Sequence, residues 1–441
     1  MKDLKQNLSD QWYNKVSLHS RWFAVYGLGK TGLSTIDHFK EFGFENYTIW
    51  DDKKNLQSQY SLNKKNFIKS LDFVDYIVIS PGIDINNSKL KKPLKKNQHK
   101  LITDLDLFYL INPKIKTIVI TGTNGKSTTC KIIEHFLKKN KIDVKIGGNI
   151  GSPILRVKPK KNSLVVIEAS SFQLAYSKFI KPTYAILLNI SQDHLDWHKK
   201  LKDYVDAKFK IFSLQDSKNF AFISEGQMVR EFKKRKNKSL LKIVNENSYL
   251  KIKHKIKNKY LNLKINEKNM SFAYELSKIL KINANSFAKS FSSFKGLPHR
   301  YEIFKTYKNI RFINDSKATS FEATKHALIS NNNIYWIVGG LPKAGDKFNF
   351  TNEEENIIKA FIIGKSPNFF KKQLKNKIDY KFSQNIKNAL ISIFNEVKKS
   401  PKRECTVLFS PASASYDQFK NFEERGNQFK KLVKFYGNRS Y

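Results

Sequence analysis

The chain has 441 residues and a formal net charge of +43 at pH 7. This length suits two to four domains, and a hydrophobic content of 40% is enough to build globular cores. So strong a positive charge would fit a nucleic-acid-binding protein. Lysine greatly outnumbers arginine, however, and the lysines are scattered along the chain. We therefore expect solvated basic faces and no nucleic-acid partner.

No apolar run approaches the roughly 18–20 residues that a membrane-spanning helix needs. Residues 1–14 are polar and do not read as a signal peptide. The two cysteines, Cys130 and Cys405, lie far apart without metal-ligand spacing, as expected for reduced thiols. We expect a cytoplasmic monomer with no membrane insertion.

Residues 22–110 alternate short apolar runs with helical stretches, which is the pattern of a parallel α/β sheet. The expected strands are Trp22–Tyr26, Tyr47–Trp50 and Tyr76–Ser80. The segment Gly27-Leu-Gly-Lys-Thr-Gly32 fits Gly-x-Gly-x-x-Gly, and Asp51 and Asp52 end the next strand. By itself this predicts a Rossmann domain and an NAD-dependent dehydrogenase. The same geometry binds any diphosphate attached to a nucleoside.

The α/β pattern restarts after Asn112-Pro113 with the apolar run Ile115–Ile120. Thr121-Gly-Thr-Asn-Gly-Lys-Ser127 follows, and a helix is expected from about Lys126 to Lys139. Glycines at such a bend let backbone N–H groups surround phosphate oxygens, a lysine reaches the terminal phosphates, and a serine hydroxyl can hold Mg²⁺. Ile120 stands where a strict Walker A sequence has its first glycine. The segment predicts a nucleoside-triphosphate enzyme.

Further strands are expected at Leu164–Ile167 and Ala185–Asn189, and polar groups follow both. Glu168 would point at the phosphate loop, where Mg²⁺ would lie. It could instead be an acid that stabilises a helix N-terminus, and His194, after Asp193, could be a surface histidine. Lys208 lies on an expected helix, Asp203–Phe212. The tract Lys233–Lys264 is expected to hold short strands and exposed loops.

Residues 294–300 carry the glycine and proline of an interdomain linker, and a third α/β segment follows. Its strands are expected at Ile310–Ile313, Tyr335–Val338, Phe361–Ile363 and Thr406–Phe409, with a final helix from about Tyr416 to Lys434. Two polar strings, 314–319 and 410–426, follow strands and open helices. Together with Gly339-Gly-Leu-Pro-Lys343 they favour a carboxylate or phosphate site, although both could be simple helix caps.

These motifs, in this order, resemble the Mur ligase family over roughly residues 20–437. The string 410–426 resembles the D-glutamate-adding branch. The resemblance implies three successive α/β domains: a Rossmann-like UDP-binding domain (1–112), a central P-loop ATPase domain (113–297) and a C-terminal Rossmann-like domain that binds the amino acid (298–441). It implies an ATP-dependent ligase that joins D-glutamate to UDP-MurNAc-L-Ala through an acyl phosphate in peptidoglycan precursor synthesis.

The resemblance also implies roles for individual residues. Lys126, His194 and Lys208 would be catalytic, and two Mg²⁺ ions would be held by Ser127, Glu168, His194 and a carbamylated Lys208. ATP would be bound by Gly122, Thr123, Asn124, Gly125, Lys126, Ser127, Thr128, Asn269, Arg300, Asp315 and Lys317. The UDP-sugar substrate would be bound by Gly27, Gly29, Thr31, Asp51, Asp52, Gly82, Asn149 and His194. D-Glutamate would be bound by Thr319, Lys343, Ser415, Tyr416 and Phe422.

Three alternatives remain at this stage. A dehydrogenase would leave Gly122–Ser127 and the third segment without a role. A nucleic-acid-stimulated ATPase rests on charge alone, and no recognised nucleic-acid-binding module is found. Another Mur-type ligase, or a ligase that adds glutamate to folates, would share the phosphate loop, but the folate enzyme lacks a first segment of this kind.

Overall fold

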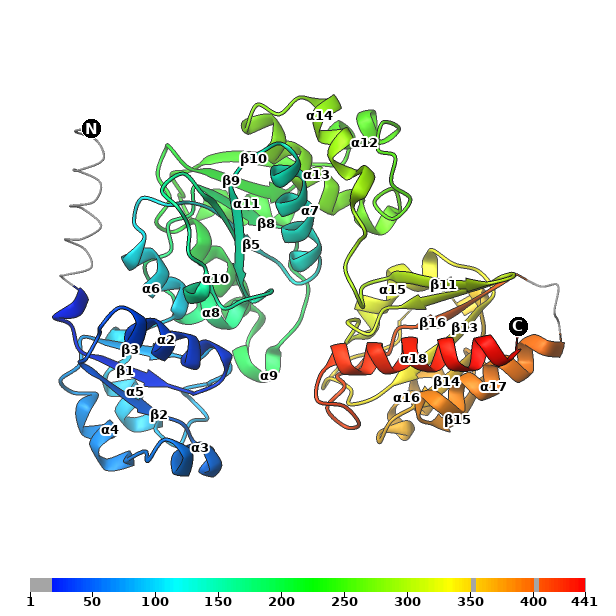
Figure 1. Cartoon of the computed structure of the whole chain (residues 1–441), viewed down its shortest axis with the longest axis horizontal. Coiled ribbons are helices and arrows are strands. Elements are labelled where there is room, and N and C mark those ends of the chain that lie inside the picture. The colour runs from blue at the N-terminus through cyan, green and yellow to red at the C-terminus, as the bar shows by residue number, and fades with distance from the viewer. Residues whose placement is uncertain (1–17, 350–353, 400–403, 441) are drawn as a thin grey trace. The chain divides into compact units, whose positions relative to one another are not determined.

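A computed structural model describes residues 18–349, 354–399 and 404–440. The chain divides into two units (Figure 1). The first comprises residues up to Lys257 together with residues 268–294, and the second comprises residues 258–267 and those from Lys295 onward. Within the described ranges, no helix has both the length and the apolar character needed to cross a membrane.

The first unit begins with a four-stranded parallel sheet in the order β2-β1-β3-β4. Its strands are β1 Phe23–Tyr26, β2 Tyr47–Trp50, β3 Tyr76–Ile79 and β4 Leu101–Ile102. Its helices are α2 Lys30–Glu41, α3 Lys54–Gln59, α4 Lys64–Ser70, α5 Lys91–Lys96 and α6 Asp104–Ile111. The three strands predicted here are confirmed, and β4 adds a short fourth one.

A second parallel sheet follows, with six strands in the order β10-β9-β8-β5-β7-β6. Its strands are β5 Lys116–Thr121, β6 Val144–Gly148, β7 Leu164–Glu168, β8 Tyr184–Leu187, β9 Phe220–Ser224 and β10 Leu240–Val244. The helices are α7 Lys126–Lys139, α8 Ser171–Tyr176, α9 Leu195–His198, α10 Leu201–Phe209, α11 Gln227–Lys234, α12 Asn247–Lys253, α13 Lys264–Ile279 and α14 Ala284–Lys289. The predicted helix Lys126–Lys139 is confirmed.

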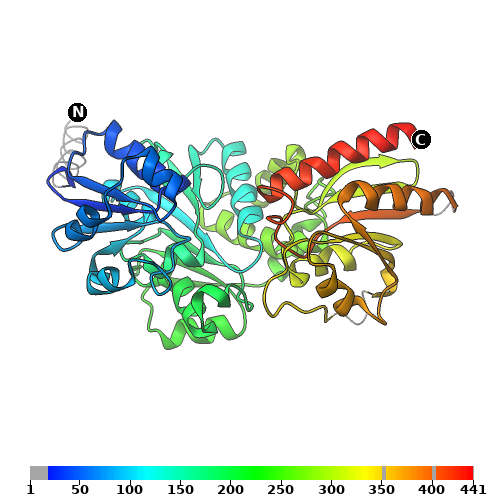
Figure 2. The same cartoon turned by 90° about the horizontal axis from the view of Figure 1, so that it is seen from below.

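One hydrophobic cluster joins the two sheets of the first unit. It contains alternate residues of β1, such as Phe23 and Val25, and residues of the second sheet, such as Val119 and Ile167. Helix α6 lies between them and buries nearly every side chain, among them Leu107 and Phe108. Because these side chains exclude water together, the two sheets form one unit (Figures 1 and 2).

The second unit contains a six-stranded sheet in the order β11-β12-β16-β13-β14-β15. Its strands are β11 Glu302–Tyr307, β12 Ile310–Asn314, β13 Ile334–Gly339, β14 Ile357–Ile363, β15 Tyr380–Gln384 and β16 Cys405–Phe409. Its helices are α15 Phe321–Ile329, α16 Pro367–Leu374, α17 Ile386–Lys399 and α18 Phe422–Ser440. Strand β11 pairs antiparallel with β12, and the other neighbours are parallel.

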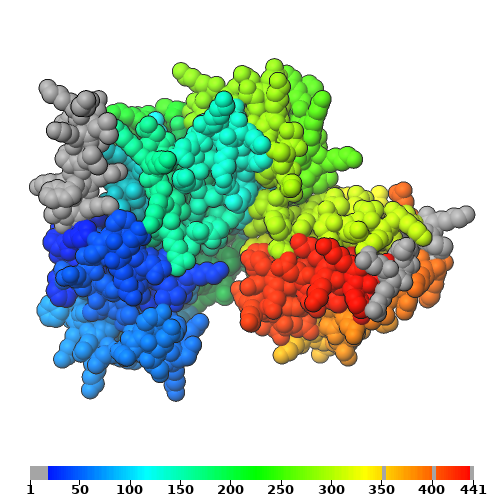
Figure 3. Space-filling view, viewed as in Figure 1, coloured from blue at the N-terminus to red at the C-terminus, as the bar shows by residue number. Residues whose placement is uncertain are grey.

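Alternation along β13 distributes the core of the second unit over two faces. Trp336 and Val338 pack in one cluster with side chains of α15 and α16. Tyr335 and Ile337 pack in the other with side chains of α17 and α18. Successive side chains of a strand point to opposite faces, so both faces of this sheet are covered by helices (Figure 2). Helix α18, red in Figure 3, lies on the surface of this unit.

The structure corrects two local predictions. The last helix begins at Phe422 and not near Tyr416, because the side chain of Asn421 accepts a hydrogen bond from Glu424 N at 2.8 Å and caps the helix there. The Lys-rich tract holds one strand, β10, and one complete helix, α12, between the end of α11 and the start of α13. Tyr249 and Ile252, three residues apart on α12, are buried and make that segment an amphipathic helix.

The three sheets agree with the expected series of three α/β segments. The domain boundaries 1–112, 113–297 and 298–441 stay a prediction.

Candidate active site

The phosphate loop lies between β5 and α7 in the first unit. Strand β5 ends at Thr121, and α7 starts at Lys126 after Gly125, whose φ of 85° lies in the left-handed region. This bend presents the N–H groups at the start of α7, where the helix dipole favours an anion. Of the residues predicted to bind ATP, Thr123 and Asn124 lie on this bend, and Thr128 lies in the first turn of α7.

Gly125 is expected to tolerate no side chain. A Cβ there would lie 2.5 Å from Asn269 Oδ1, and the positive φ is itself unfavourable for other residues. We expect Gly125→Ala to weaken ATP binding at least tenfold and to lower the melting temperature by a few degrees. Calorimetric titration with a non-hydrolysable ATP analogue measures the first effect. Gly151→Ala is the matched control, because a Cβ there meets open space at a similar φ of 66°.

Asn189, which follows β8, holds the loop from the side. Thr123 N donates to Asn189 O at 3.0 Å, and Asn124 N donates to Asn189 Oδ1 at 2.9 Å. The Thr123 hydroxyl is hydrogen-bonded to the Tyr204 hydroxyl at 2.9 Å. Neither Asn189 nor Tyr204 was predicted as a site residue, since neither carries a motif that reveals its contact with the loop. Their bonds pre-organise the turn before a phosphate arrives.

Lys126 and Lys208 meet at the same carbonyl. Lys126 Nζ donates to Gly122 O at 2.8 Å and to Thr123 O at 2.7 Å. Lys208 Nζ, from α10, also donates to Gly122 O at 2.8 Å. Burial, together with the charge of Lys126, lowers the pKa of Lys208 well below its ordinary value. The structure thus brings together two of the three predicted catalytic residues.

Glu168 ends β7 and lies beside the start of α7, as expected. Its carboxylate is buried and accepts from Ser127 Oγ at 2.6 Å and from Asn149 Nδ2 at 2.9 Å. Serine and carboxylate oxygens are the hard ligands that Mg²⁺ prefers, so these residues fit a magnesium ion next to a bound triphosphate. In the described parts of the chain, no group of three or more His, Cys, Asp and Glu side chains could hold a metal ion by itself.

His194 lies on the loop between β8 and α9, with a φ of 55°. Its Nε2 is 3.4 Å from Asp193 Oδ2, and its ring centroid is 4.7 Å from that of Phe172. The side chain is 36% exposed. It is therefore accessible, unlike nearby His198, which is buried and hydrogen-bonded to Ser171 Oγ.

Asn269, on α13, contacts the helix that follows the phosphate loop. Its Oδ1 accepts from Thr129 Oγ1 at 3.2 Å. Asn269, predicted to bind the adenine nucleotide, is thereby in contact with the helix that follows the phosphate loop.

A second cluster of predicted residues lies at the carboxyl edge of the first sheet. Gly27 has a φ of 97°, and a Cβ there would lie 2.7 Å from Ser80 Cβ. Asp51 Oδ2 accepts from Leu28 N at 2.7 Å and its Oδ1 accepts from Lys53 N at 2.8 Å. Asp52 accepts from the Tyr26 hydroxyl at 2.6 Å. The Asp51 carboxylate thus fixes the backbone of the glycine loop, and a role of either carboxylate in binding a ligand stays a prediction.

The other predicted residues of this edge lie on the same loops. Gly29 caps the N-terminus of α2, and Thr31 lies in its first turn. Gly82 lies in the loop after β3, and a Cβ there would meet open space. The residues predicted to bind the UDP end thus lie at one helix N-terminus and on the loops that follow the strands of this sheet.

The remaining predicted residues lie in the second unit. Asp315 follows β12 and is buried; it accepts from Tyr301 N at 3.0 Å and from Ser410 Oγ at 2.8 Å. Burial raises its pKa to about 7, against hydrogen bonds and the charge of Arg300, which lower it. Lys317 Nζ lies 3.9 Å from the centroid of the Phe422 ring. The structure therefore brings predicted nucleotide and amino-acid residues together here.

Asp315 should make stability depend on pH. Its pKa is raised from 3.8 to about 7 in the folded chain, so its contribution is present below pH 4 and is lost as pH rises toward 7. The slope is at most about 1.4 kcal/mol per pH unit. We expect Asp315→Asn, which mimics the protonated acid, to flatten it. Hydrogen exchange in β12 and β16 at pH 5 and 7 measures this, with the exposed Glu355→Gln as control.

The loops expected to bind the amino acid surround a buried arginine that sequence reasoning did not single out. Arg425 Nη2 donates to Ser316 O at 2.7 Å and to Ser413 O at 2.9 Å. It lies under the loop that carries Ser415, which is buried, and Tyr416, which is 73% exposed. Thr319 and Lys343 are half-buried on neighbouring loops. The string 410–426 contains five charged residues, and nothing in the sequence distinguishes Arg425 from the other four.

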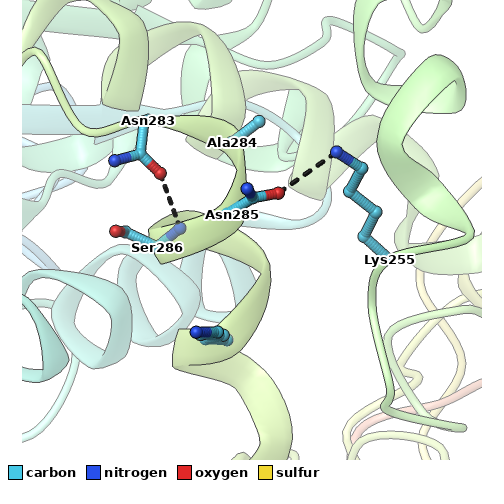
Figure 4. A pocket seen from close by; sticks show the side chains of 6 residues that line it. Lys255, Asn283, Ala284, Asn285 and Ser286 are labelled. Atoms are coloured by element: carbon cyan, nitrogen blue, oxygen red, sulfur yellow. Dashed lines mark hydrogen bonds between the residues drawn. The ribbon is translucent and has the colours of Figure 1, made fainter.

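A hollow of about 460 Å³ in the first unit holds none of the predicted residues (Figure 4). It is lined by Lys255 and by residues at the start of α14, where Asn283 caps the helix by accepting from Ser286 N. Lys255 Nζ donates to Asn285 Oδ1 at 3.1 Å. Because none of the residues predicted to bind nucleotide, substrate or metal lines this hollow, it adds nothing to the candidate site.

Family models and curated relatives match this chain over most of its length. The family model for the Mur ligase middle domain matches residues 120–289, and that for the Mur ligase MurD-like N-terminal domain matches residues 21–101. The UDP-N-acetylmuramoylalanine--D-glutamate ligase of Rickettsia felis is 34% identical over 93% of this chain and 96% of its own length. The enzyme of that name from Aquifex aeolicus is 34% identical over 95% and 100%.

Solved structures show the same fold at low identity. The UDP-N-acetylmuramate-alanine ligase MurC of Thermotoga maritima has a TM-score of 0.56 and 16% identity, covering 95% of this chain and 100% of that one. The MurF ligase of Thermotoga maritima in complex with ADP has a TM-score of 0.56 and 17% identity, covering 95% and 99%. With relatives above 30% identity along nearly the whole length, the dehydrogenase and nucleic-acid alternatives fall away. The chain belongs to the Mur ligase family of ATP-dependent, amide-forming enzymes of peptidoglycan precursor synthesis.

Proposed function

We propose that this protein joins D-glutamate to UDP-MurNAc-L-Ala, using ATP, in the cytoplasm. The observation that carries the proposal is the match, over nearly their whole lengths, to curated ligases whose printed names state this amino acid and this acceptor. The phosphate loop supports the ATP step, since Ser127, Glu168, Lys126 and Lys208 converge on it.

The chemistry needs an activated carboxylate. An oxygen of the terminal alanine carboxylate attacks the γ-phosphorus of ATP, the bond to ADP breaks, and an acyl phosphate forms. The neutral amine of D-glutamate then attacks the acyl carbon, and phosphate leaves as the amide forms. Two anions must meet in the first step, so positive groups have to offset their repulsion.

In our proposal Lys126 contacts the transferring phosphate, and Ser127 and Glu168 hold one Mg²⁺. His194 and a carbamylated Lys208 hold a second. Bound Mg²⁺ would neutralise phosphate charge and orient the γ-phosphate for attack. The low pKa of Lys208 favours its neutral amine, which is the form that adds CO₂.

Each substrate is assigned its own set of residues. The UDP end would lie on Gly27, Gly29, Thr31, Asp51, Asp52 and Gly82, and Asn149 and His194 would orient the muramoyl part. The adenine nucleotide would contact Gly122–Thr128, Asn269, Arg300, Asp315 and Lys317. D-Glutamate would contact Thr319, Lys343, Phe422 and the backbone of Ser415 and Tyr416, with Arg425 supporting that loop.

A substrate-dependence assay tests the proposal. The purified protein is expected to release phosphate from ATP only when UDP-MurNAc-L-Ala and D-glutamate are both present, and mass spectrometry should detect the amide product. D-Glutamate is expected to outperform L-glutamate by at least a hundredfold in kcat/KM. Equal turnover with L-glutamate would contradict the assigned amino acid, and turnover with UDP-MurNAc in place of UDP-MurNAc-L-Ala would contradict the assigned acceptor.

A further inference from the structure

Helices α8 and α9 follow strands β7 and β8 of the second sheet. Tyr176 at the end of α8 and Lys199 just after α9 contact a loop of the first sheet. The loop Ser80–Ile85 follows β3 and carries Gly82. Helix α8 begins at Ser171, just after Glu168, and ends at Tyr176. Helix α9 begins just after His194. In Figure 1, α8 lies beside the first sheet. The carboxyl ends of β7 and β8 are thus connected by short segments to a loop at the UDP edge.

The hydroxyl of Tyr176 makes the closest of these connections. It donates to Ile83 O at 3.1 Å and accepts from Ile85 N at 3.1 Å. One hydroxyl therefore uses both its proton and a lone pair on the backbone of the same loop. Burial raises the pKa of Tyr176 to about 12, so the proton is retained at any working pH. The ring packs against Trp197, with centroids 5.5 Å apart.

The loop Ser80–Ile85, to which Tyr176 is hydrogen-bonded, is itself hydrogen-bonded to the glycine-rich turn that begins at Gly27. Ser80 Oγ donates to Gly27 O at 2.8 Å. Lys199, which ends α9, places its Nζ 3.9 Å from Asp84 Oδ2. At the other end of α8, Gln173 Nε2 donates to the buried Asp104 at 3.1 Å, which anchors the helix. A continuous set of contacts thus runs from Glu168 through α8 to Gly27.

We propose that Tyr176 is a positioning residue that holds the Ser80–Ile85 loop in place for the UDP end of the substrate, at a set separation from Glu168. The inference rests on the proposed function. A substrate that reaches from the first sheet to the phosphate loop binds well only if both ends find their partners already in position. In this proposal Tyr176, at the end of α8, fixes the position of the loop through its two backbone hydrogen bonds and does not contact the substrate itself.

Tyr176→Phe removes only the hydroxyl and leaves the ring packing in place. We expect KM for UDP-MurNAc-L-Ala to rise about five- to tenfold, the cost of two backbone hydrogen bonds. The dissociation constant of UDP alone, measured by calorimetry, should rise by a similar factor. We expect kcat, KM for ATP and KM for D-glutamate to stay within twofold. A purely structural role would not separate one KM from the other two.

Tyr184→Phe is the matched control, since Tyr184 is a half-buried tyrosine of β8; it should leave all constants unchanged. Unchanged KM and UDP affinity in Tyr176→Phe would overturn the inference. So would an equal rise in all three KM values with a lower melting temperature. If the wild-type protein neither binds UDP nor turns over UDP-MurNAc-L-Ala, the proposed function fails instead, which keeps the two outcomes distinct.

Discussion

Replacing Lys126 by alanine is expected to lower kcat for amide synthesis by about a thousandfold. The lysine opens α7, and its ammonium lies over the phosphate turn, bonded to the carbonyls of Gly122 and Thr123. In the proposed mechanism its charge would lie nearest to the γ-phosphoryl group of ATP. Negative charge builds up around this group as the carboxylate attacks and the bond to ADP breaks. Loss of one such pre-organised group in a water-poor site typically costs 10²–10³ in rate.

The measurement is the rate of ADP release at saturating UDP-MurNAc-L-Ala and D-glutamate. Lys139→Ala is the matched control, because Lys139 is an exposed lysine at the last position of the same helix. It should retain wild-type activity. Lys126 Nζ donates to two carbonyls of its own loop, so the variant is expected to keep its melting temperature within a few degrees. A Lys126→Ala enzyme with near-normal kcat would remove the phosphate loop from the mechanism.

Replacing Lys208 by alanine is expected to lower kcat by at least a hundredfold, and short carboxylic acids such as acetate should restore part of it. The side chain is 1% exposed, and its Nζ lies at Gly122 O, beside the phosphate turn. A positively charged Lys208 would be unfavourable at this position, because its charge would repel that of Lys126 and its burial would remove the ammonium group from water. Carbamylation would convert it into an anion that can ligate Mg²⁺.

Two further variants keep this prediction sharp. Lys208→Met preserves volume, so it separates the loss of the carbamate from a cavity. Lys202→Ala removes an exposed lysine of the same helix and should be silent. With ¹³C-bicarbonate, NMR should show a carbamate signal that is absent from Lys208→Met. A wild-type protein without that signal, or variants that no carboxylic acid restores, would assign Lys208 another role.

Much of the local structure follows from short segments of sequence. The apolar runs that became β1, β5 and β13 were recognisable because strands buried on both faces are almost continuously apolar. Helix α7 was predictable from its apolar periodicity and from the glycine before it. The start of α18 was not, because the segment 410–421 offers several residues that could cap a helix, namely Ser410, Ser413, Ser415, Asp417 and Asn421. Only the folded loop selects Asn421.

The candidate site divides in the same way. The phosphate loop residues Gly122, Gly125, Lys126 and Ser127 lie within one short segment, so nucleoside-triphosphate binding could be predicted from the sequence without a structure. Glu168 was a weaker prediction, since a strand-end acid has several uses; the structure shows that it contacts Ser127 Oγ, and its role as a metal ligand stays a prediction. Asn189, Tyr204 and Arg425 gave no usable signal, because each acts through a contact with a residue far away in the sequence: Asn124 N, the Thr123 hydroxyl and Ser316 O respectively.

The sequence alone determined which chemistry this protein carries, because phosphate-binding turns depend on a few residues in fixed local order. It also determined the α/β class, because strand and helix periodicities are local. The tertiary structure alone decided which distant groups meet at that turn, since contact between Ser127 and Glu168 or between Gly122 and Lys208 depends on strand order. It also decided that Lys208 is buried and that Tyr176 grips the loop after β3, because burial and contact arise only when the elements pack.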